Sequence, residues 1–222
     1  MMNVIDALNN RRSVRQFKSD QISRDTILKI MTAAGRSPSW ADTQPWELFI
    51  AAGETLNKIR QKSLVLYQEG QNGGPELARP ADWPPALKQR MTENMAHRMA
   101  AMGVDRNDEK GREANTRRNY EFFGAPVVAY LCLDRSLTAW SIFDMGIMAQ
   151  SIMLAAQEYG VDSIPAVSLV NYPEIIRDEL GISDDLTIIF GIALGYAQID
   201  DPVNKPRSLR RPIEAFLHMK GI

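Results

Sequence analysis

Three arginines and a serine stand together near the start of the chain, in the run Arg11-Arg12-Ser13-Val14-Arg15. A guanidinium is a rigid, planar fork of donors that matches two phosphate oxygens at once, and a serine hydroxyl can complete such a cradle. A second basic group, Arg207 and Arg210, lies in the tail. Basic runs are also common on solvated turns. The run by itself therefore leaves two interpretations open, an anion site and a plain surface turn.

A second stretch suited to chemistry is the loop at residues 36–46, which contains two prolines, several short polar side chains and two tryptophans. Prolines and small polar residues do not continue a helix, so the stretch is expected to be an ordered loop. Trp40 and Trp46, together with Phe123 farther along, offer apolar surface on which a flat aromatic ligand can stack. The pattern is typical of a binding loop.

Several other kinds of active site are poorly supported. His97 and His218 lie far apart in the sequence, with no ligand spacing around either. Cys132 is the single cysteine, which rules out intrachain disulfides and a multi-cysteine metal site. Neither phosphate-binding glycine motif nor a serine nucleophile elbow is present. What remains suits a protein whose chemistry belongs to a bound phosphorylated cofactor.

The charge balance argues against a nucleic-acid protein. The 222 residues carry 26 basic and 27 acidic side chains, for a net charge of −1. A protein that works by neutralising phosphates would show a basic excess. No charged start is followed by an apolar run, and no stretch approaches ~18 uninterrupted apolar residues. We expect a cytoplasmic protein with neither a nucleic-acid nor a membrane partner.

Helical and strand patterns place these residues on defined elements. Residues 3–10 predict a short helix that delivers the arginine run. Ser23 can cap a second helix, ended by Gly35, because apolar residues recur there every three or four positions. Alternation from Trp46 predicts a strand, and residues 54–67 predict a helix.

The segment from about 68 to 118 is rich in turns and charges, and its fold is harder to predict. Within it, four methionines spaced four, four and three apart would share one helix face: Met91, Met95, Met99 and Met102. Core or interface packing is one interpretation of this face. The other is an adaptable wall over a ligand pocket, which suits flexible thioethers. The segment is either a lid, an interface element or mobile.

The second half predicts the core. Residues 127–133 form a near-continuous apolar run, expected to be a strand buried on both faces with Cys132 as a small core residue. Residues 141–159 predict a helix that is apolar all round, which must lie at the centre of the domain or in a subunit interface.

Later elements are shorter. Residues 163–170 look β-like, a helix starts near Pro173, and residues 186–197 predict a strand. Its Gly191 and Gly195 allow close approach of another group. From residue 200 the chain is expected to be an extended, proline-punctuated tail.

Taken in order, the motifs resemble the FMN-dependent nitroreductase family, of the bacterial oxygen-insensitive NAD(P)H nitroreductase type. The resemblance covers nearly the whole chain except residues 68–118. The matching motifs are Arg11-Arg12-Ser13-Val14-Arg15, Ser37-Pro38-Ser39 with Gln44-Pro45-Trp46, Phe123-Gly124-Ala125-Pro126, Tyr159-Gly160-Val161, Leu194-Gly195-Tyr196 and Arg207-Ser208-Leu209-Arg210-Arg211-Pro212.

The resemblance implies an α+β fold with a mostly antiparallel central sheet flanked by helices, in an intertwined homodimer with FMN at the interface. The chain would be one domain over residues 1–222, with a helical or loop excursion at about 68–118 and an extended arm at about 200–222.

The resemblance also implies residue roles. Phosphate and ribityl contacts would come from Arg11, Arg12, Ser13 and Arg15, closed by Arg207 and Arg210. The other subunit would approach the flavin with Pro38, Ser39, Trp40 and Gln44. The ring would lie along Ile164, Pro165, Ala166, Val167 and Ser168. A substrate pocket would use Trp40, Phe123, Met95 and Met99, and the flavin pyrimidine edge would be met by Asn115 or Asn119.

One departure from the family pattern is Asp42, where many members place asparagine. If its carboxylate faced the ring, it would disfavour negative charge on the reduced flavin.

The implied activity is reduction of nitroaromatic compounds to hydroxylamines, with NADH or NADPH as donor and ping-pong hydride transfer through FMN. No side chain is required as acid or base, and no metal is implied. Reduction of quinones or free flavin, and reductive dehalogenation, are alternatives on the same scaffold. A flavin-binding protein without turnover is the alternative from a different class.

Overall fold

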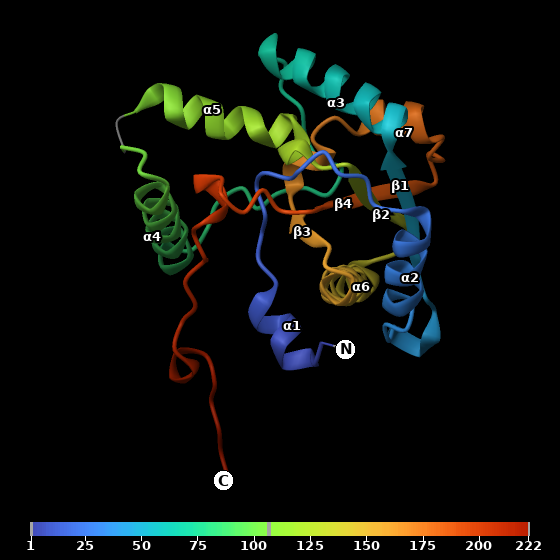
Figure 1. The fold of residues 1–222 in the computed structure, drawn as a ribbon. Coiled ribbons are helices and arrows are strands. Elements are labelled where there is room, and N and C mark those ends of the chain that lie inside the picture. Colours follow the sequence, from blue (N-terminus) through green and yellow to red (C-terminus); the bar gives the residue numbers. More distant parts are fainter. Residues whose placement is uncertain (1, 106–107, 222) are drawn as a thin grey trace.

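Four strands form an antiparallel sheet in the computed structural model, which describes residues 2–105 and 108–221 (Figure 1). Their spatial order is β1-β2-β4-β3, and every neighbouring pair is antiparallel. The strands are β1 Trp46–Ala52, β2 Val127–Asp134, β3 Asp162–Pro165 and β4 Leu186–Gly195. The predicted fold class, α+β with an antiparallel sheet, is confirmed.

Helices cover both faces of this sheet. Helices α3, α5 and α7 lie on one face, α2 and α6 lie on the other, and α1 packs on α6 (Figure 1). The helices are α1 Val4–Asn10, α2 Arg24–Ala34, α3 Gly53–Gln68, α4 Pro85–Met102, α5 Glu109–Tyr120, α6 Ala139–Glu158 and α7 Pro173–Leu180. Short 3-10 turns are η1 Trp40–Asp42, η2 Phe122–Gly124, η3 Val167–Val170, η4 Pro202–Asn204 and η5 Ile213–Ala215.

Strand β2 is the centre of the core. Its side chains alternate between two clusters, with Tyr130 and Cys132 in the layer under α3 and α7, and Ala129 and Leu131 in the layer under α6. All of its residues except the last are buried. The expectation of a strand buried on both faces, with Cys132 as a core residue, is confirmed.

The first two helices begin and end where the sequence predicted. The side chain of Asn3 accepts a hydrogen bond from the N–H of Asp6, and Ser23 caps α2 through Thr26 in the same way. Helix α2 ends at Gly35.

The β-like pattern at residues 163–170 is only half a strand. Strand β3 ends at Pro165, and Val167–Val170 turn into η3. The turn places Leu169 directly over Gly191 of β4, where an added Cβ would lie 2.6 Å from the Leu169 Cβ. The close approach expected at Gly191 is therefore made by this leucine, and it requires a residue without a side chain.

The segment at 68–118 contains two helices rather than loops alone. Helix α5 was not predicted because its sequence has no apolar stripe, and it starts instead from the cap that Asp108 gives to Gly111. Glu76, which precedes α4 in the sequence, joins this segment to α7 and β4. Its carboxylate accepts from Arg177 at 2.7 Å and from the N–H of Ile188 at 2.6 Å.

Helix α6 is, within the described residues, a helix long and apolar enough to cross a membrane by length and composition. It packs instead against the sheet and α2, with Met145, Met148 and Ile152 fully buried. Its first turns are not covered, since Trp140 is 71% exposed and Phe143 is 66% exposed. The expectation that this helix needs cover on every side is met only in part by the chain itself.

The tail leaves the body after η4 and extends away from it as an arm (Figure 1). The expectation of an extended tail from residue 200 is met only in part, because Pro202–Asn204 form η4 with Val203 and Asn204 buried. After η4, the described residues of the arm include the short turn η5, as their prolines lead one to expect. Apolar side chains on the arm are exposed, among them Leu209, Ile213, Phe216 and Met219.

Candidate functional site

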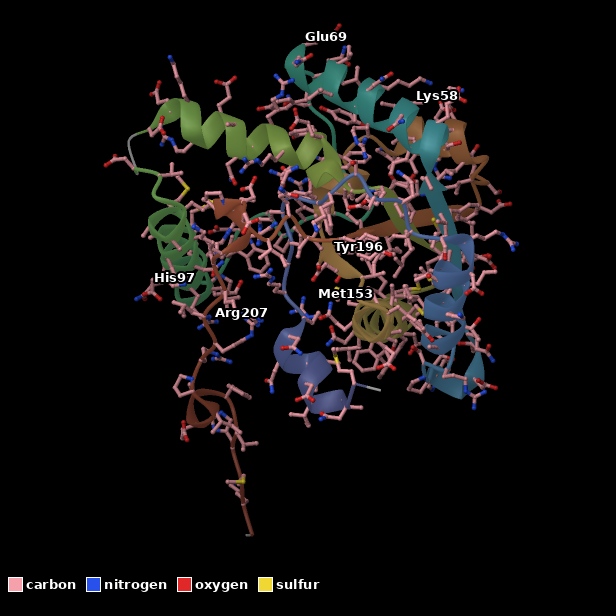
Figure 2. The ribbon with its side chains drawn as sticks, in the orientation of Figure 1. Lys58, Glu69, His97, Met153, Tyr196 and Arg207 are labelled. Carbon is pink, nitrogen blue, oxygen red and sulfur yellow. The ribbon has the colours of Figure 1, made fainter. Side chains whose placement is uncertain are left out.

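Both basic groups of the sequence meet at one cavity of about 240 Å³, which we call the arginine cavity. Helix α1 delivers one side of it and the start of the arm delivers the other. Arg207 lies where the arm passes α1 and donates to the carbonyl of Asn9 at 2.7 Å (Figure 2). The lining residues are Leu8, Asn9, Arg11, Arg12, Ser13, Arg15, Pro206, Arg207, Ser208 and Arg210.

A buried asparagine in η4, Asn204, ties the two ends of the chain together. Its side-chain oxygen accepts from the N–H of Arg15 at 2.7 Å, and its amide nitrogen donates to the carbonyls of Gln16 and Gln198. Its own carbonyl accepts from the Arg12 guanidinium at 2.9 Å. Asn204 is 2% exposed, so its own polar atoms are paired away from water. No sequence pattern marks this residue, because a lone asparagine between prolines resembles any turn residue.

The arginine cavity lacks acids. Among the described residues, none of its five arginines forms an ion pair with a carboxylate. Burial lowers the pKa of Arg11, and the charge of Arg210 lowers it further. Burial also lowers the pKa of Arg15 to about 10, with a smaller contribution from Arg98. These guanidiniums remain charged at neutral pH, so the cavity concentrates positive charge that an anion would stabilise.

Helix α4 carries a further arginine, Arg98, whose charge acts on Arg15 of the cavity and which no sequence motif marks. The helix packs against η4, next to the segment that holds Arg15. The Nε of Arg98 is buried and has no hydrogen-bond partner among the described residues, and the same is true of the Oδ1 of Asn94, one turn earlier. His97 lies on the outer side of the helix (Figure 2).

A larger cavity of about 700 Å³ lies between α4 and α5, and we call it the methionine cavity. Of the four methionines predicted to share a face, three line it. Met99 is buried, whereas Met91 and Met95 are half exposed at the cavity wall. The geometry favours the second interpretation of the face, an adaptable wall, over tight core packing. The lining residues are Met91, Thr92, Met95, Ala96, Met99, Ala100, Val104, Asp105, Arg112, Asn115 and Thr116.

The segment expected to run along a flavin ring is the corner between β3 and η3. The side chain of Ile164 is buried in the core, Pro165 and Ala166 are half-buried, and Val167 is exposed. The Oγ of Ser168 lies 3.4 Å from the Oδ1 of Asn119 in α5. The side-chain amide of Asn119 also donates to the carbonyl of Asn115, and Asn115 lines the methionine cavity. This corner and the methionine cavity are therefore neighbours.

The Trp40 loop, residues 38–44, stands apart from these cavities. Trp40 is 69% exposed, and Pro38 and Gln44 are exposed as well. Ala41, Asp42 and Gln44 all have positive φ, a conformation that is strained for such residues. The Oδ1 of Asp42 accepts a hydrogen bond from the Gln44 amide at 3.1 Å, so this carboxylate is engaged locally.

Asp144 of α6 holds this loop. Its buried carboxylate accepts from the N–H of Trp40 at 3.2 and 3.3 Å. An acid inside an apolar stretch of helix is a detectable sequence signal, since a buried carboxylate must find donors. Asp144 is nevertheless absent from the residues predicted for the site.

Within one chain, the Trp40 loop and the N-terminal segment that leads to the arginine cavity are anchored at opposite ends of α6. The loop is attached at Asp144, near the start of α6, whereas the N–H of Met2, which precedes α1, is bound at Glu158, near the end of α6. Fourteen helical residues span about 21 Å. Phe123 does not complete a pocket with Trp40 either, because its side chain is buried in the core. The structure thus joins the two basic groups and leaves the aromatic loop apart.

Comparison with known proteins adds a family. The model of the nitroreductase family matches residues 8–196. The chain is 31% identical to a 4-nitrobenzoate reductase of Pseudomonas putida over 212 residues, which cover 96% of this chain and 93% of the relative. It is 29% identical to a nitrobenzene nitroreductase of Ectopseudomonas oleovorans over 215 residues, covering 95% and 94%.

A solved structure agrees along the whole chain. The FMN and NADPH-dependent nitroreductase NfnB from Sphigopyxis sp. strain HMH superposes with a TM-score of 0.92 at 31% identity, and the match covers 100% of both chains.

Proposed function

The chain belongs to the nitroreductase family of NAD(P)H-dependent oxidoreductases, and we propose that it is a homodimeric FMN enzyme that reduces nitroaromatic compounds to hydroxylamines by a ping-pong cycle. One observation carries the proposal. Guanidiniums from both ends of the chain converge on a single cavity that holds no ion-paired carboxylate among the described residues.

The residues present fit FMN. Its phosphate would be held by Arg11, Arg12, Ser13, Arg207 and Arg210, which supply forked donors without competing acids. Its ring would lie along the corner at residues 164–168. The N–H groups of Val167 and Ser168 have no acceptor in the described part of the chain, and they could donate to the ring. When bound, FMN supplies the hydride chemistry that no side chain here offers.

The proposed dimer is supported by apolar surfaces that are exposed in a single chain. Trp40, Trp140 and Phe143 form exposed apolar surface at the start of α6, and the arm extends without cover. A second copy would bury these surfaces, as stable homodimers do. It would also bring its own Trp40 loop to the flavin of this chain, which removes the 21 Å separation along α6.

The methionine cavity is proposed as the acceptor site. Met95 and Met99 provide an apolar wall for a flat aromatic ring, next to the corner where the flavin ring would lie. By likeness to the relatives, nitrobenzoate and nitrobenzene are the acceptors to try first. The nitro group would be reduced in two-electron steps through nitroso to hydroxylamine, each step consuming one NAD(P)H. The chain's own residues bind, orient and exclude water.

In this proposal the chain works as one domain. The helices α4 and α5 form its lid or interface element, and the arm wraps the second subunit. A single buried cysteine suits a reducing compartment, so the cytoplasm is the proposed location.

The test is the spectrum and turnover of the purified protein. We expect a yellow protein with a flavin absorbance, or a colourless one that takes up added FMN. NADPH should be consumed steadily with 4-nitrobenzoate or nitrobenzene present, and NADH is assayed alongside. A protein that fails to take up FMN overturns the proposal, and one that binds FMN without turnover is a flavin-binding protein instead.

A further inference from the structure

The methionine cavity carries one basic side chain on a wall that is otherwise mostly uncharged. Among the described lining residues, Arg112 of α5 is the single cation, and Asp105, which precedes α5, is the single acid. The other lining residues are methionine, alanine, valine, threonine and asparagine. A largely apolar cavity selects its ligand by the few polar groups placed around it. The position of Arg112 therefore bears directly on which acceptor fits.

Arg112 lies on the face of α5 that leads to the corner at residues 164–168. Asn115 follows it by three positions and Asn119 by seven, spacings that repeat along one side of an α-helix. Asn119 lies beside Ser168 of the corner, whereas Asn115 and Arg112 line the cavity. Seven helical residues rise about 10 Å. One helix face thus joins the corner, where the flavin ring would lie, to a basic residue two turns away.

The guanidinium of Arg112 is only weakly engaged by the chain itself. Its ion pair among the described residues is with Glu109 at 4.0 Å, and the two side chains are 53% and 90% exposed. A pair this exposed and this long contributes little. By contrast, Arg117 of the same helix donates to Glu121 at 2.7 Å. Arg112 can therefore turn its planar fork toward a ligand without breaking a strong contact.

An aromatic acid with its nitro group opposite the carboxylate suits these positions. With the nitro group at the corner, the ring lies in the cavity beside Met95 and Met99, and the carboxylate extends toward Arg112. A guanidinium holds a carboxylate by two parallel hydrogen bonds. A carboxylate next to the nitro group would stay at the corner instead. A cationic acceptor would need Asp105, which precedes α5 and lies outside this face.

We propose that Arg112 selects the acceptor, and that the chain prefers nitroaromatic acids whose carboxylate lies opposite the nitro group over neutral nitroaromatic compounds. This inference rests on the proposed function and deepens it, because it names the class of acceptor. Arg112 binds and orients the acceptor and takes no part in the transfer of hydride.

The first test compares two acceptors of the same shape, 4-nitrobenzoate and its neutral amide 4-nitrobenzamide, with the FMN-loaded enzyme. Arg112→Gln should lower kcat/KM for the acid about tenfold, mainly through KM, the effect of one lost hydrogen bond to a charged group. The value for the amide should stay unchanged. Equal losses for acid and amide, or no loss for the acid, overturn the inference.

Arg117→Gln is the matched control for this test. It removes a similarly exposed arginine from the same helix, at a position outside the cavity. Both acceptors should be reduced by this variant as they are by the wild type. A loss for the acid as large as that of Arg112→Gln would show a general effect of charge on α5 and would overturn the inference.

The second test moves the charge around the ring. The ratio of wild-type kcat/KM to that of Arg112→Gln should be about ten for 4-nitrobenzoate and about one for 2-nitrobenzoate. Taking this ratio for each compound removes their different ease of reduction. An equal ratio for the two isomers overturns the orientation. A wild-type preference for the cation 4-nitrobenzylamine would assign the selection to Asp105 and overturn the inference as well.

A binding measurement gives a readout without turnover. Calorimetric titration of the oxidised holoenzyme with 4-nitrobenzoate, in the absence of NADPH, should give a Kd about tenfold weaker in Arg112→Gln. The phosphate that distinguishes NADPH from NADH is the other anion this guanidinium would hold. If Arg112→Gln weakens NADPH relative to NADH and leaves 4-nitrobenzoate unchanged, the inference is overturned.

Failure of the inference is distinguishable from failure of the proposed function. A protein that takes up no FMN, or that reduces neither nitro compound, contradicts the proposed function. A protein that binds FMN and reduces the acid and the amide with the same dependence on Arg112 contradicts this inference alone.

Discussion

The arginine cavity and the Trp40 loop are held by the chain in opposite ways. The cavity is built from both ends of the chain, and the buried Asn204 holds it with four hydrogen bonds. The loop is exposed, its backbone is strained at Ala41, Asp42 and Gln44, and few bonds fix it. The proposed phosphate site is thus lined within one chain, whereas the aromatic surface proposed to cover the flavin ring faces outward. Under the proposed function, the second region would work on another copy of the chain.

The change with the largest expected effect is Phe143→Asp, which attacks the outward-facing region. Phe143 is exposed in the chain but buried in the proposed dimer. An unpaired carboxylate buried there should cost about 3–5 kcal/mol per site, enough to dissociate a micromolar dimer. We expect a folded monomer in sedimentation that has also lost its FMN, since the partner's loop is gone.

Val65→Asp is the control for this variant. Val65 is similarly exposed but lies on α3, on the other face of the sheet. It should remain a dimer with bound FMN. A wild-type protein that sediments as a monomer and still retains FMN would contradict the division of the site between copies.

Arg12→Ala tests the inward-facing region. Loss of one forked contact to a phosphate should weaken FMN binding by about 1.5–3 kcal/mol, which is roughly 10- to 150-fold. Riboflavin has no phosphate, so its affinity should hardly change. Arg24→Ala, an exposed arginine at the start of α2, is the control for lost charge. Equal losses for FMN and riboflavin would remove Arg12 from the phosphate site.

Asn204→Ala tests whether the cavity is preformed. It leaves the N–H of Arg15 buried without its acceptor, which should lower the free energy of unfolding by about 1–3 kcal/mol even without cofactor. Urea unfolding of the apo protein measures this, with the exposed Asn72→Ala as control. If both variants have the same free energy of unfolding, Asn204 does not hold the two chain ends together. The arginine cavity would then be no more firmly held than the Trp40 loop.

Features that depend on neighbouring residues in the sequence could be predicted, whereas features that depend on contacts between distant segments could not. The arginine run, the capped helix α2 and the buried strand β2 all come from patterns within a few residues, and the structure has each of them. Asn204 and Arg98 acquire their places only because η4 meets the N-terminal segment and α4 meets η4. No local pattern encodes such a meeting.

Helix α5 illustrates the limit for secondary structure. Its twelve residues carry no apolar stripe, so periodicity has nothing to detect. The helix is stabilised by its Asp108 cap and by packing of its last turn, where Tyr120 stacks on Tyr67 with ring centroids 4.1 Å apart. The two partners of that stack lie far apart in the sequence, so no local pattern predicts their contact.

The smallest effect is expected from Ser39→Ala, which returns to the exposed loop. The hydroxyl of Ser39 accepts from the N–H of Gln44 at 2.9 Å, a bond that helps hold the positive φ of the loop. Because the group is near water, its loss should cost only about 0.5–1 kcal/mol of stability. FMN affinity should fall by a few-fold at most, since the loop is still shaped when the second copy packs on it. If Ser39→Ala destabilises the apo protein as much as Asn204→Ala does, the loop is as firmly built as the cavity. The two regions would then differ only in exposure and not in how the chain holds them.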